Sequence, residues 1–542
     1  MTISSAAETG EELISTRFAR DTLLVTICVL LSRMTGFVRV LVAAAVLSNG
    51  LLGDTYHAAN TIPNLLFELF AGGALQAVLV PAFVSARRQG GDEELGKTAG
   101  AFVGVIVLVL AAVAVIGMLL APLIARALTL GEGDSVLAAE KLDVMTPMLI
   151  VFIPQVLFYG VGMVATAALA AQRRFLAAAI APALNNAVVI TCYLLYRASR
   201  EGEVATLDLS PLQFTIIAGG TTLAVIVFTS LPSIILTGSG LRWRPRWDPS
   251  HSAIRGIRGS VGWAAMSVAG TLVPTGAAIV LGYDAVGGVA VFTMAWAFFV
   301  LPHALVAIPV ATTLAPRVAD AWQRGRAQEV RAIVERSAQV VIPLLLVGGA
   351  AMAALAWPIA RIAGSFGQAA SQGIAPIAHA LAMFGFGLGG YGLAFVMTRI
   401  LFSLGDVRRA AILVTCSAAI GVVSMFVATR LFAETERAAA LALGYGITQT
   451  VSALLLTWRV RSTTGSPTWH ATGRLTGAAV VAAAIAGVAM LFIQGRFGSG
   501  RAASLASIVT AGGAGAVIFG AVVAALSGIR PATLLRLGRG AS

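Results

Sequence analysis

Long apolar stretches, separated by short polar segments, make up most of this chain. Fourteen of them hold at least about 18 mainly apolar residues, and a helix of that length crosses the roughly 30 Å hydrocarbon core of a bilayer. The expected helices are residues 21–47, 56–86, 98–126, 142–170, 176–197, 211–236, 260–282, 286–316, 332–360, 374–404, 408–431, 438–458, 471–494 and 503–527. The pattern predicts an all-α polytopic membrane protein with 14 transmembrane helices.

Composition excludes a soluble protein and changes how the charge is interpreted. With 58% hydrophobic and 11% charged residues, the chain has too little polar surface for a soluble domain. A formal net charge of +13 would indicate nucleic acid in a soluble protein, but here the basic residues lie in short loops between apolar stretches. Nucleic acid is therefore not an expected partner. Cys28, Cys192 and Cys416 lie within apolar stretches without a spacing pattern, which predicts buried free thiols and no metal framework.

The positions of the basic residues predict the orientation of the chain. If the N-terminus is cytoplasmic, 25 of the 37 Lys and Arg residues lie in cytoplasmic segments and 9 lie outside. The remaining three, Arg33, Arg39 and Arg399, lie within the membrane. Because cytoplasmic loops retain an excess of Lys and Arg, we expect a multi-pass cell-membrane protein. Both of its terminal tails, 1–20 and 529–542, are expected in the cytoplasm.

Two pairs of segments repeat along the chain. LVPAFVSARRQG at 79–90 matches LAPRVADAWQRG at 314–325, and we call the step from 79 to 314 the repeat offset. The arginine pair at 173–174 matches the pair at 408–409 at the same repeat offset. Since six predicted helices separate equivalent positions, both halves have the same orientation, as in parallel transporter repeats. The repeat predicts two six-helix lobes, followed by two helices outside the repeat.

The predicted domain boundaries follow from this repeat. They are an N-lobe at 21–236, a basic cytoplasmic loop at 237–259, a C-lobe at 260–462 and two final helices at 463–528. The inter-lobe loop carries Trp243, Trp247 and five arginines. Such a segment either contacts anionic headgroups at the membrane surface or is an ordinary basic linker, and the sequence leaves both interpretations open.

Arg33 and Arg39 lie inside the first apolar stretch. They fall roughly 16 and 26 Å along the helix axis, so both cannot reach the cytoplasmic surface. A charge at the bilayer centre costs about 2.5–3.5 kcal/mol on insertion scales, and guanidinium groups bind phosphate bidentately. We therefore expect a water-filled cavity for an anionic substrate, with a bend at Gly36 turning both arginines into it. The alternatives are ion pairs with Asp54 or Glu68, or contact of Arg39 with the outer headgroups.

The second predicted helix carries several polar residues and a proline. Pro63 cannot donate a backbone hydrogen bond, so we expect a kink that frees the Ala59 carbonyl near Asn64. The kink is equally compatible with helix packing alone. Asp54 at the outer end and Glu68 deep in the span are candidates either to titrate during transport or to neutralise an arginine.

Several motifs carry a resemblance to a known family. They are SRMTGFVRV, GDTYHAANTIPNLL, FAGGALQAVLVPAF, AALAAQRRFLAAAIAPALNN, LVAIPVATTLAPRVADAW and RILFSLGDVRRA. In this order, from about residue 20 to 460, they resemble the MurJ/MviN family of lipid II flippases in the MOP transporter superfamily. The resemblance implies two lobes in a V shape with a cationic central cavity for the pyrophosphate and sugar-peptide headgroup. It also implies that the last two helices form a groove for the polyprenyl tail.

The resemblance implies roles for individual residues. Arg33 and Arg39 correspond to the cavity arginines of the family, and Asp54 and Asn64 to its polar positions on the second helix. Arg399 matches a basic position of some members, and its alternative role is to cap the cytoplasmic end of its own helix.

Four positions depart from the proteobacterial members of the family. Phe67 occupies the place of an arginine and Gly72 the place of an acid. Glu68 replaces a further basic residue, and Ala297 falls where the eighth helix has an arginine. We therefore expect a cavity that is less cationic than the family pattern, above all in the second lobe.

The expected function is translocation of lipid II, the lipid-linked peptidoglycan precursor, from the cytoplasmic to the outer leaflet by alternating access. No catalysis, cofactor or metal site is expected, and the coupling would come from H⁺, Na⁺ or the membrane potential. Flipping of another polyprenyl-linked glycan and cation-coupled export are the alternatives within this class. Other cell-wall synthesis proteins are possible partners at the cytoplasmic face. An intramembrane glycosyltransferase is excluded because the outer loops are too short for a catalytic domain.

Overall fold

A computed structural model confirms the all-helical fold expected of a polytopic membrane protein. It describes residues 24, 27–47, 50–70, 76–130, 132, 134–202, 205–364, 373–465 and 470–527, and every regular element within these ranges is helical. The two predicted cytoplasmic tails lie outside the described residues.

The helices follow one another with short connections. The first helix covers Ile27–Leu47. It is followed by α2 (Leu51–Phe70), α3 (Gln76–Leu119), α4 (Ala121–Leu128), α5 (Ser135–Phe152), α6 (Gln155–Ala171), α7 (Leu176–Ser199), α8 (Pro211–Phe214), the π-helical turn η2 (Thr215–Gly219), α9 (Gly220–Gly238), α10 (Ser252–Gly282), α11 (Gly288–Gln323), α12 (Ala327–Ala354), α13 (Ala356–Ala363), α14 (Ala375–Ser403), α15 (Val407–Leu431), the 3₁₀ turn η4 (Glu434–Glu436), α16 (Arg437–Thr464), α17 (His470–Gln494) and α18 (Arg501–Ser527).

Thirteen helical segments among the described residues are long and apolar enough to cross a membrane, one fewer than the fourteen predicted. The difference lies at the predicted helix 56–86. Its first part is α2, whose buried and cavity-facing polar side chains lower its apolar content. Its second part belongs to α3, which continues to Leu119 through a kink at Gly90 and Gly91, where Gly91 has a φ of 65°. Sequence patterns alone did not separate these two pieces.

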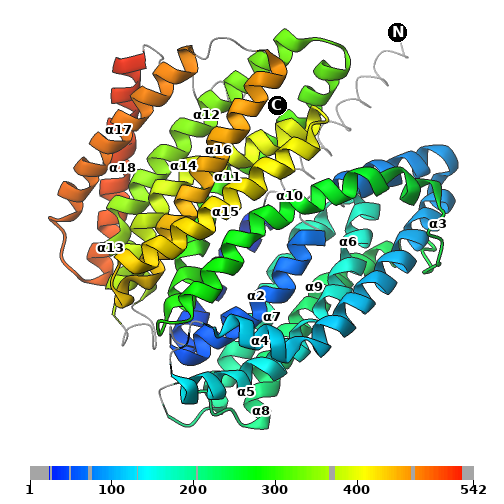
Figure 1. Ribbon diagram of the computed structural model, residues 1–542, viewed down its shortest axis with the longest axis horizontal. Coiled ribbons are helices and arrows are strands. Elements are labelled where there is room, and N and C mark those ends of the chain that lie inside the picture. Colours follow the sequence, from blue (N-terminus) through cyan, green and yellow to red (C-terminus); the bar gives the residue numbers. More distant parts are fainter. Residues whose placement is uncertain are drawn as a thin grey trace, which may run out of the picture.

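The helices form two groups that can be followed in Figure 1. Helices α2 to α9 pack on one another on one side, and helices α11 to α16 pack on one another on the other. Helix α10 packs mainly on α15 and so belongs to the second group. Within the described residues, the contacts between the groups concentrate where α2 meets α10 and α11. The buried core of the first group extends across this junction to Ile279, Tyr283 and Val289.

Helix boundaries recur at the repeat offset seen in the sequence. Helix α3 ends at Leu119 and α12 ends at Ala354, and these two positions are separated by that offset. The short helices α4 (Ala121–Leu128) and α13 (Ala356–Ala363) match at both of their ends in the same way. Both halves of the chain therefore place a long helix and a short helix at equivalent positions.

The last two helices form a separate antiparallel pair. Helices α17 and α18 pack on each other and on α12 and α13 of the second group. Their common core contains Met490, Ala511 and Phe519 together with Leu355 at the start of α13. The pair lies at the edge of the molecule farthest from the first group (Figure 1).

Two local predictions were wrong. Helix α10 begins at Ser252, within the segment predicted as loop, so the irregular connection between the halves covers only 239–251. Cys416 is exposed on α15, whereas Cys28 and Cys192 are buried as predicted. An apolar stretch does not reveal which of its side chains face other helices, because lipid-facing positions are apolar as well.

A close pairing of α14 with α16 generates a prediction. Gly387 of α14 lies against Gly446 of α16, and a Cβ on Gly387 would overlap the Cα of Gly446. Glycines at such crossings allow close backbone packing. We expect Gly387→Ala to lower stability by about 1–3 kcal/mol through overpacking, measured as a lower thermal unfolding midpoint in detergent. Gly513→Ala on α18, where a Cβ meets nothing within 4 Å, is the control, and equal midpoints would contradict the prediction.

Candidate functional site

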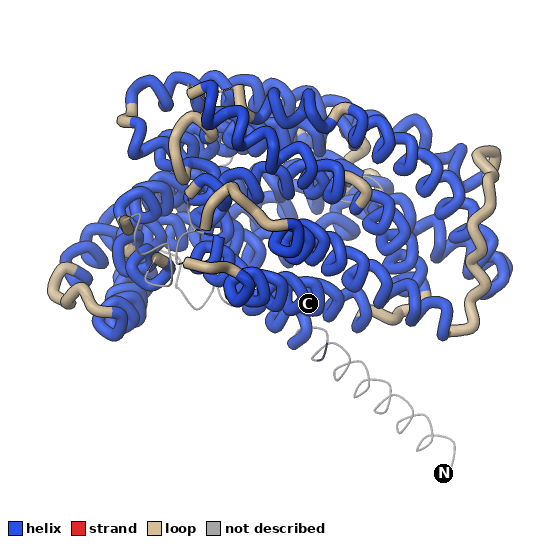
Figure 2. Tube along the Cα trace, turned by 90° about the horizontal axis from the view of Figure 1, so that it is seen from below, coloured by secondary structure: helices blue, strands red, loops and turns tan. Residues whose placement is uncertain are grey.

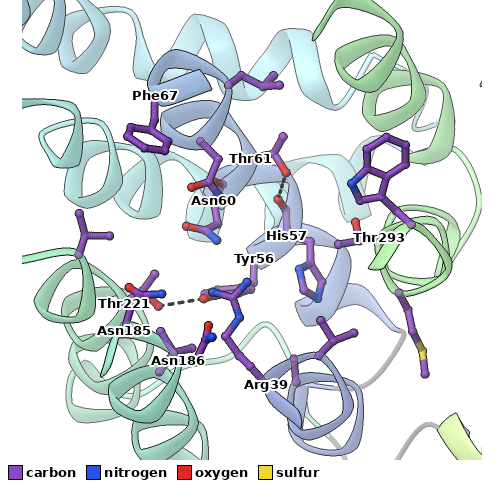
Figure 3. A pocket seen from close by; sticks show the side chains of 18 of the residues that line it. Arg39, Tyr56, His57, Asn60, Thr61, Phe67, Asn185, Asn186, Thr221 and Thr293 are labelled. Carbon is purple, nitrogen blue, oxygen red and sulfur yellow. Dashed lines mark hydrogen bonds between the residues drawn. The ribbon is translucent and has the colours of Figure 1, made fainter. Parts of the chain in front are cut away.

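A cavity of about 570 Å³ lies between the two groups of helices. The first helix, α2, α6, α7 and α9 form one wall, and α10 and α11 form the other. Figure 3 shows its polar side chains, which come largely from α2, α7 and the first helix. A cavity lined by polar groups between two helix groups has the form of a transport pathway.

The cavity is closed at one end, as the exposure of α2 shows. Asp54 and Tyr56 near the start of α2 are 0% and 1% exposed, whereas Glu68 in its last turn is exposed. The first helix shows the same gradient, from Leu47, which is fully buried, to Arg33, which is exposed. The closed end therefore lies where the first helix ends and α2 begins, and the cavity opens toward Arg33 and Glu68.

Asp54 seals the closed end by capping a helix of the opposite group. Its carboxylate accepts hydrogen bonds from the backbone N–H groups of Gly287 at 2.7 Å and Ala290 at 2.8 Å, at the start of α11. The first N–H groups of a helix lack partners within the helix, and its dipole favours a negative charge there. Gly287 has a φ of 82°, a conformation that suits glycine. These two hydrogen bonds of the buried Asp54 carboxylate form only when the two groups meet.

Further contacts join the groups beside Asp54. Tyr283, in the turn after α10, donates its hydroxyl to Thr55 Oγ1 of α2 at 3.0 Å. Lys141 of α5 lies 4.6 Å from the centre of the Tyr283 ring and is paired with Glu132. Burial raises the pKa of the neighbouring Asp284, while the Arg437 guanidinium, 2.8 Å away, opposes that shift.

Arg39 supplies a cation to the cavity wall. Its half-buried side chain lines the cavity and forms no ion pair with any carboxylate of the described residues. The guanidinium acts electrostatically on Tyr56, His57, Tyr159 and Tyr193, which places it among neutral polar groups. The alternative in which Arg39 pairs with Asp54 or Glu68 is therefore not what the structure shows. Its charge remains available to an anion.

A chain of hydroxyl groups includes Tyr56 and Tyr193, on which the Arg39 charge acts. Tyr193 donates to the Tyr56 hydroxyl at 2.9 Å. The Tyr56 hydroxyl lies 2.9 Å from Thr221 Oγ1 (Figure 3). Thr221 in turn donates to the carbonyl of Ile217, which lies in the π-helical turn η2. Insertions of this kind inside helices re-aim side chains and are frequent at functional sites. The hydroxyl chain holds α2, α7 and α9 in register around the cavity.

Asn64 follows Pro63 on α2, where the sequence predicts a kink. Its amide donates to the Asn60 carbonyl at 2.8 Å, and its side-chain oxygen accepts from the Tyr159 hydroxyl at 3.2 Å. Pro63 is buried inside α2, which continues to Phe70. Asn64 thus links α2 to α6 and lines the cavity, while a moving hinge at Pro63 stays a prediction.

Gly36 lies in an unbroken stretch of the first helix. A Cβ at this position would lie 3.3 Å from the side-chain nitrogen of Asn186. That nitrogen donates to the Ser32 carbonyl and to Thr35 Oγ1, both at 3.2 Å. Gly36 therefore lets α7 approach the first helix closely, and its role as a hinge remains a prediction.

The wall contributed by the second group has no charged residue. The residues of α10 and α11 that line the cavity are Thr275, Ile279, Ala290, Phe292, Thr293, Met294 and Trp296. All charged or titratable nitrogen and carboxylate groups of the lining, namely Arg39, His57 and Glu68, come from the first helix and α2. The cavity is thus polar and charged on one side and aromatic and neutral on the other.

The remaining predicted residues lie apart from this cavity. Arg33 is exposed and acts electrostatically on His303 of α11, so Gly36 does not bring it beside Arg39. Arg399 lies 5.2 Å from the ring centre of Phe395 on α14. His303 packs between Phe395 and Tyr391, with ring centres 5.0 and 4.1 Å away. Of the six predicted binding residues, Arg39, Asn64 and Glu68 line the cavity, and Arg33, Asp54 and Arg399 do not.

Sequence reasoning missed several polar residues of the cavity. They are Tyr56, His57, Tyr159, Asn185, Asn186, Tyr193 and Thr221. Their signal was weak, because single tyrosines, threonines and asparagines are common in membrane helices. Only their clustering in space separates them from others. Within the described residues, no group of three or more His, Cys, Asp or Glu side chains could hold a metal ion.

The fold and this cavity define the class: an integral membrane transporter with a substrate pathway between two helix groups. The model of the family described as Lipid II flippase MurJ matches residues 43–510. The chain therefore belongs to the lipid II flippase MurJ family, a family of transporters and not of enzymes.

Relatives and solved structures agree with this assignment. The chain is 27% identical to a probable lipid II flippase MurJ of Rhizobium tropici over 68% of this chain and 67% of that protein. It is 24% identical to a lipid II flippase MurJ of Burkholderia cenocepacia over 70% and 72%.

Among solved structures, a lipid II flippase MurJ in an inward closed conformation has a TM-score of 0.69 at 16% identity, over 93% of this chain and 98% of that one. An inward-facing multidrug resistance MATE family transporter of the MOP superfamily has a TM-score of 0.60 at 16% identity, over 82% and 99%. The fold is that of these transporters.

The cap on α11 generates a prediction about the closed end. Asp54→Ala removes both acceptors, and hydrogen bonds to a charged group contribute about 1.5–3 kcal/mol each. We expect the two groups to separate there. The measurement is the distance between spin labels at Leu130 and Val286, which are 77% and 66% exposed, after replacement of the native cysteines. The distance distribution should shift to longer values.

Asp134→Ala is the matched control for this measurement. Asp134 caps its own helix α5 by accepting from the backbone of Val136 and Leu137, without contacting the other group. Its removal should leave the label distance unchanged. An unchanged distance in Asp54→Ala would instead show that the cap does not hold the groups together.

Proposed function

We propose that this chain moves lipid II from the cytoplasmic to the outer leaflet by alternating access. The observation that carries the proposal is Arg39, an unpaired guanidinium in a polar cavity between two helix groups. Guanidinium groups bind phosphate oxygens bidentately, and family membership makes a pyrophosphate-linked lipid the fitting anion.

The two helix groups act as the moving lobes in this proposal. We assign 21–236 to the N-lobe, 260–462 to the C-lobe and 463–528 to the two further helices, with both tails in the cytoplasm. Helix α2 and the first part of α3 then form the fourteenth span. The recurrence of helix ends at the repeat offset supports two equivalent lobes. The excess of Lys and Arg in the segments assigned to the cytoplasm supports the orientation.

In this orientation the closed end faces outward and the cavity opens toward the cytoplasm. The pyrophosphate enters past Arg33 and Arg399 and binds at Arg39, with Asn64 and the tyrosine hydroxyls as neutral hydrogen-bonding groups. Glu68 would repel an anion that stays at the cytoplasmic end of α2, so it favours movement toward Arg39. Breaking the Asp54 cap then opens the outer side.

The neutral wall of the C-lobe receives the uncharged part of the headgroup. Trp296 and Phe292 offer aromatic surface, on which a saccharide ring can pack, and Thr293 offers a hydroxyl. The polyprenyl tail stays in lipid along α17 and α18. Exposed apolar side chains on α17, including Val481, Val488 and Phe492, support this path.

Arg39 provides the direct test. In cells depleted of this protein, we expect wild type to restore exposure of the precursor on the outer leaflet. Arg39→Gln should slow flipping by roughly 10–100-fold, as loss of a charge-assisted contact of about 1.5–3 kcal/mol implies. The control, Arg324→Gln, removes an exposed cation paired with Asp320 and should restore flipping. Unchanged sidedness on depletion, with no redundant transporter, would point to another lipid-linked glycan or to an exported cation.

The empty cavity should respond to the membrane potential. Return of the Arg39 charge toward the negative cytoplasm is favoured by about 2.3 kcal/mol per charge per 100 mV. We expect the flipping rate to fall when valinomycin and external K⁺ collapse the potential. Nigericin, which removes the proton gradient alone, distinguishes H⁺ coupling. A rate indifferent to the potential would remove this part of the proposal.

A further inference from the structure

The segment that connects α9 to α10 packs its backbone on three glycines of α3, namely Gly96, Gly100 and Gly104. Residues 241–247 follow α9 and run beside α3, and Figure 2 shows this connection as a long loop along one end of the molecule. A Cβ at Gly96 would lie 2.6 Å from the Arg242 carbonyl oxygen. Cβ atoms at Gly100 and Gly104 would lie even closer to the carbonyl oxygens of Arg244 and Arg246.

The spacing of these contacts shows that the segment is extended. Four residues of a helix advance about 6 Å, and two residues of an extended chain advance about 6.6 Å. Every second residue of the segment therefore meets every fourth residue of α3. The Arg246 backbone N–H also donates to the Gly100 carbonyl at 3.0 Å. Backbone contacts to α3 thus set the position of the segment.

The two sides of this extended segment differ in polarity. Leu241 is 4% exposed and, with Trp243, packs into the core between α3, α6 and α9. The Trp243 indole N–H also donates to Thr237 Oγ1 at 3.0 Å. The alternate residues Arg242, Arg244 and Arg246 are exposed. We call these three residues the arginine strip.

Nearby carboxylates do not neutralise the arginine strip. None of its members forms an ion pair with a described residue; Glu93 and Glu94 instead pair with Lys97. Asp248 accepts hydrogen bonds from the Ser250 hydroxyl at 2.7 Å and from the Ser250 backbone at 3.2 Å. The strip therefore presents three unpaired guanidinium groups at intervals of roughly 7 Å on a fixed backbone.

We propose that the arginine strip binds the phosphate headgroups of anionic membrane lipids. The exposed indole of Trp247, which is 62% exposed, marks this end of the segment as interfacial. Guanidinium groups bind phosphate bidentately, and the chain passes from one helix group to the other at this point. A bound headgroup would hold that passage at the membrane surface. This inference does not depend on what the central cavity carries.

Lipid titration of the purified protein tests the proposal. Native mass spectrometry would count bound phosphatidylglycerol and phosphatidylcholine of equal chain length. We expect R242Q/R244Q/R246Q to weaken phosphatidylglycerol binding on the order of 100-fold, with phosphatidylcholine unchanged. The control R324Q/R326Q/R409Q removes three exposed cations that each lie within 4.0 Å of a carboxylate, and it should bind phosphatidylglycerol as wild type does.

A single substitution tests the geometry while keeping every arginine. Gly100→Ala should push the segment away from α3 and weaken phosphatidylglycerol binding at least several-fold. Gly238→Ala, at the end of α9 where a Cβ meets nothing within 4 Å, is its control. The proposal is overturned if the triple variant of the strip binds phosphatidylglycerol like its control. It is also overturned if Arg39→Gln removes that binding, since the lipid would then sit in the central cavity.

Discussion

The arrangement of the two helix groups depends on one contact. In this contact the Asp54 carboxylate of α2 accepts hydrogen bonds from the backbone at the start of α11. A charge that is 0% exposed requires compensation, and here two backbone N–H groups and a helix dipole of the opposite group provide it. The contact exists only when the groups meet at this end. Because rigid helices extend from it, contact at the start of α2 leaves the groups apart toward Arg33 and Glu68.

The charge distribution of the cavity complements this closure. Arg39, His57 and Glu68 lie on the first helix and α2, whereas the facing wall of α10 and α11 is uncharged. No ion pair between described residues therefore crosses the cavity itself, and separation or approach of the walls breaks none. The polar contacts that hold the closed end together are concentrated at Asp54 and Thr55, at the start of α2.

The sequence predicts the role of a residue when that role is local. It does not predict a role that depends on partners brought together by the fold. Arg39 was predictable because an arginine in an apolar helix is costly wherever it points. The repeat was visible because Pro81 and Pro316 mark it, and helix ends recur at the same offset. The backbone partners of Asp54, in the turn before α11 and in its first turn, were not predictable because they are distant in sequence. The exposed position of Cys416 was missed because lipid-facing and buried positions are equally apolar.

The repeat also shows how one architectural position has diverged between the halves. The repeat offset places Gly96, Gly100 and Gly104 of α3 on Arg331, Glu335 and Gln339 of α12.

In both halves this face of the helix contacts the chain where it leaves the last helix of that half, α9 in the first half and α16 in the second. In the second half, side chains make the attachment: Arg331 donates to the Thr464 carbonyl at 2.6 Å, and Glu335 and Gln339 both bind Thr472 Oγ1. In the first half, backbone packed on glycine makes it, so Arg242, Arg244 and Arg246 of the departing segment form no ion pair with a described residue. The same structural requirement is therefore met by side chains after the second half and by backbone after the first, and only the first solution leaves a row of arginines exposed.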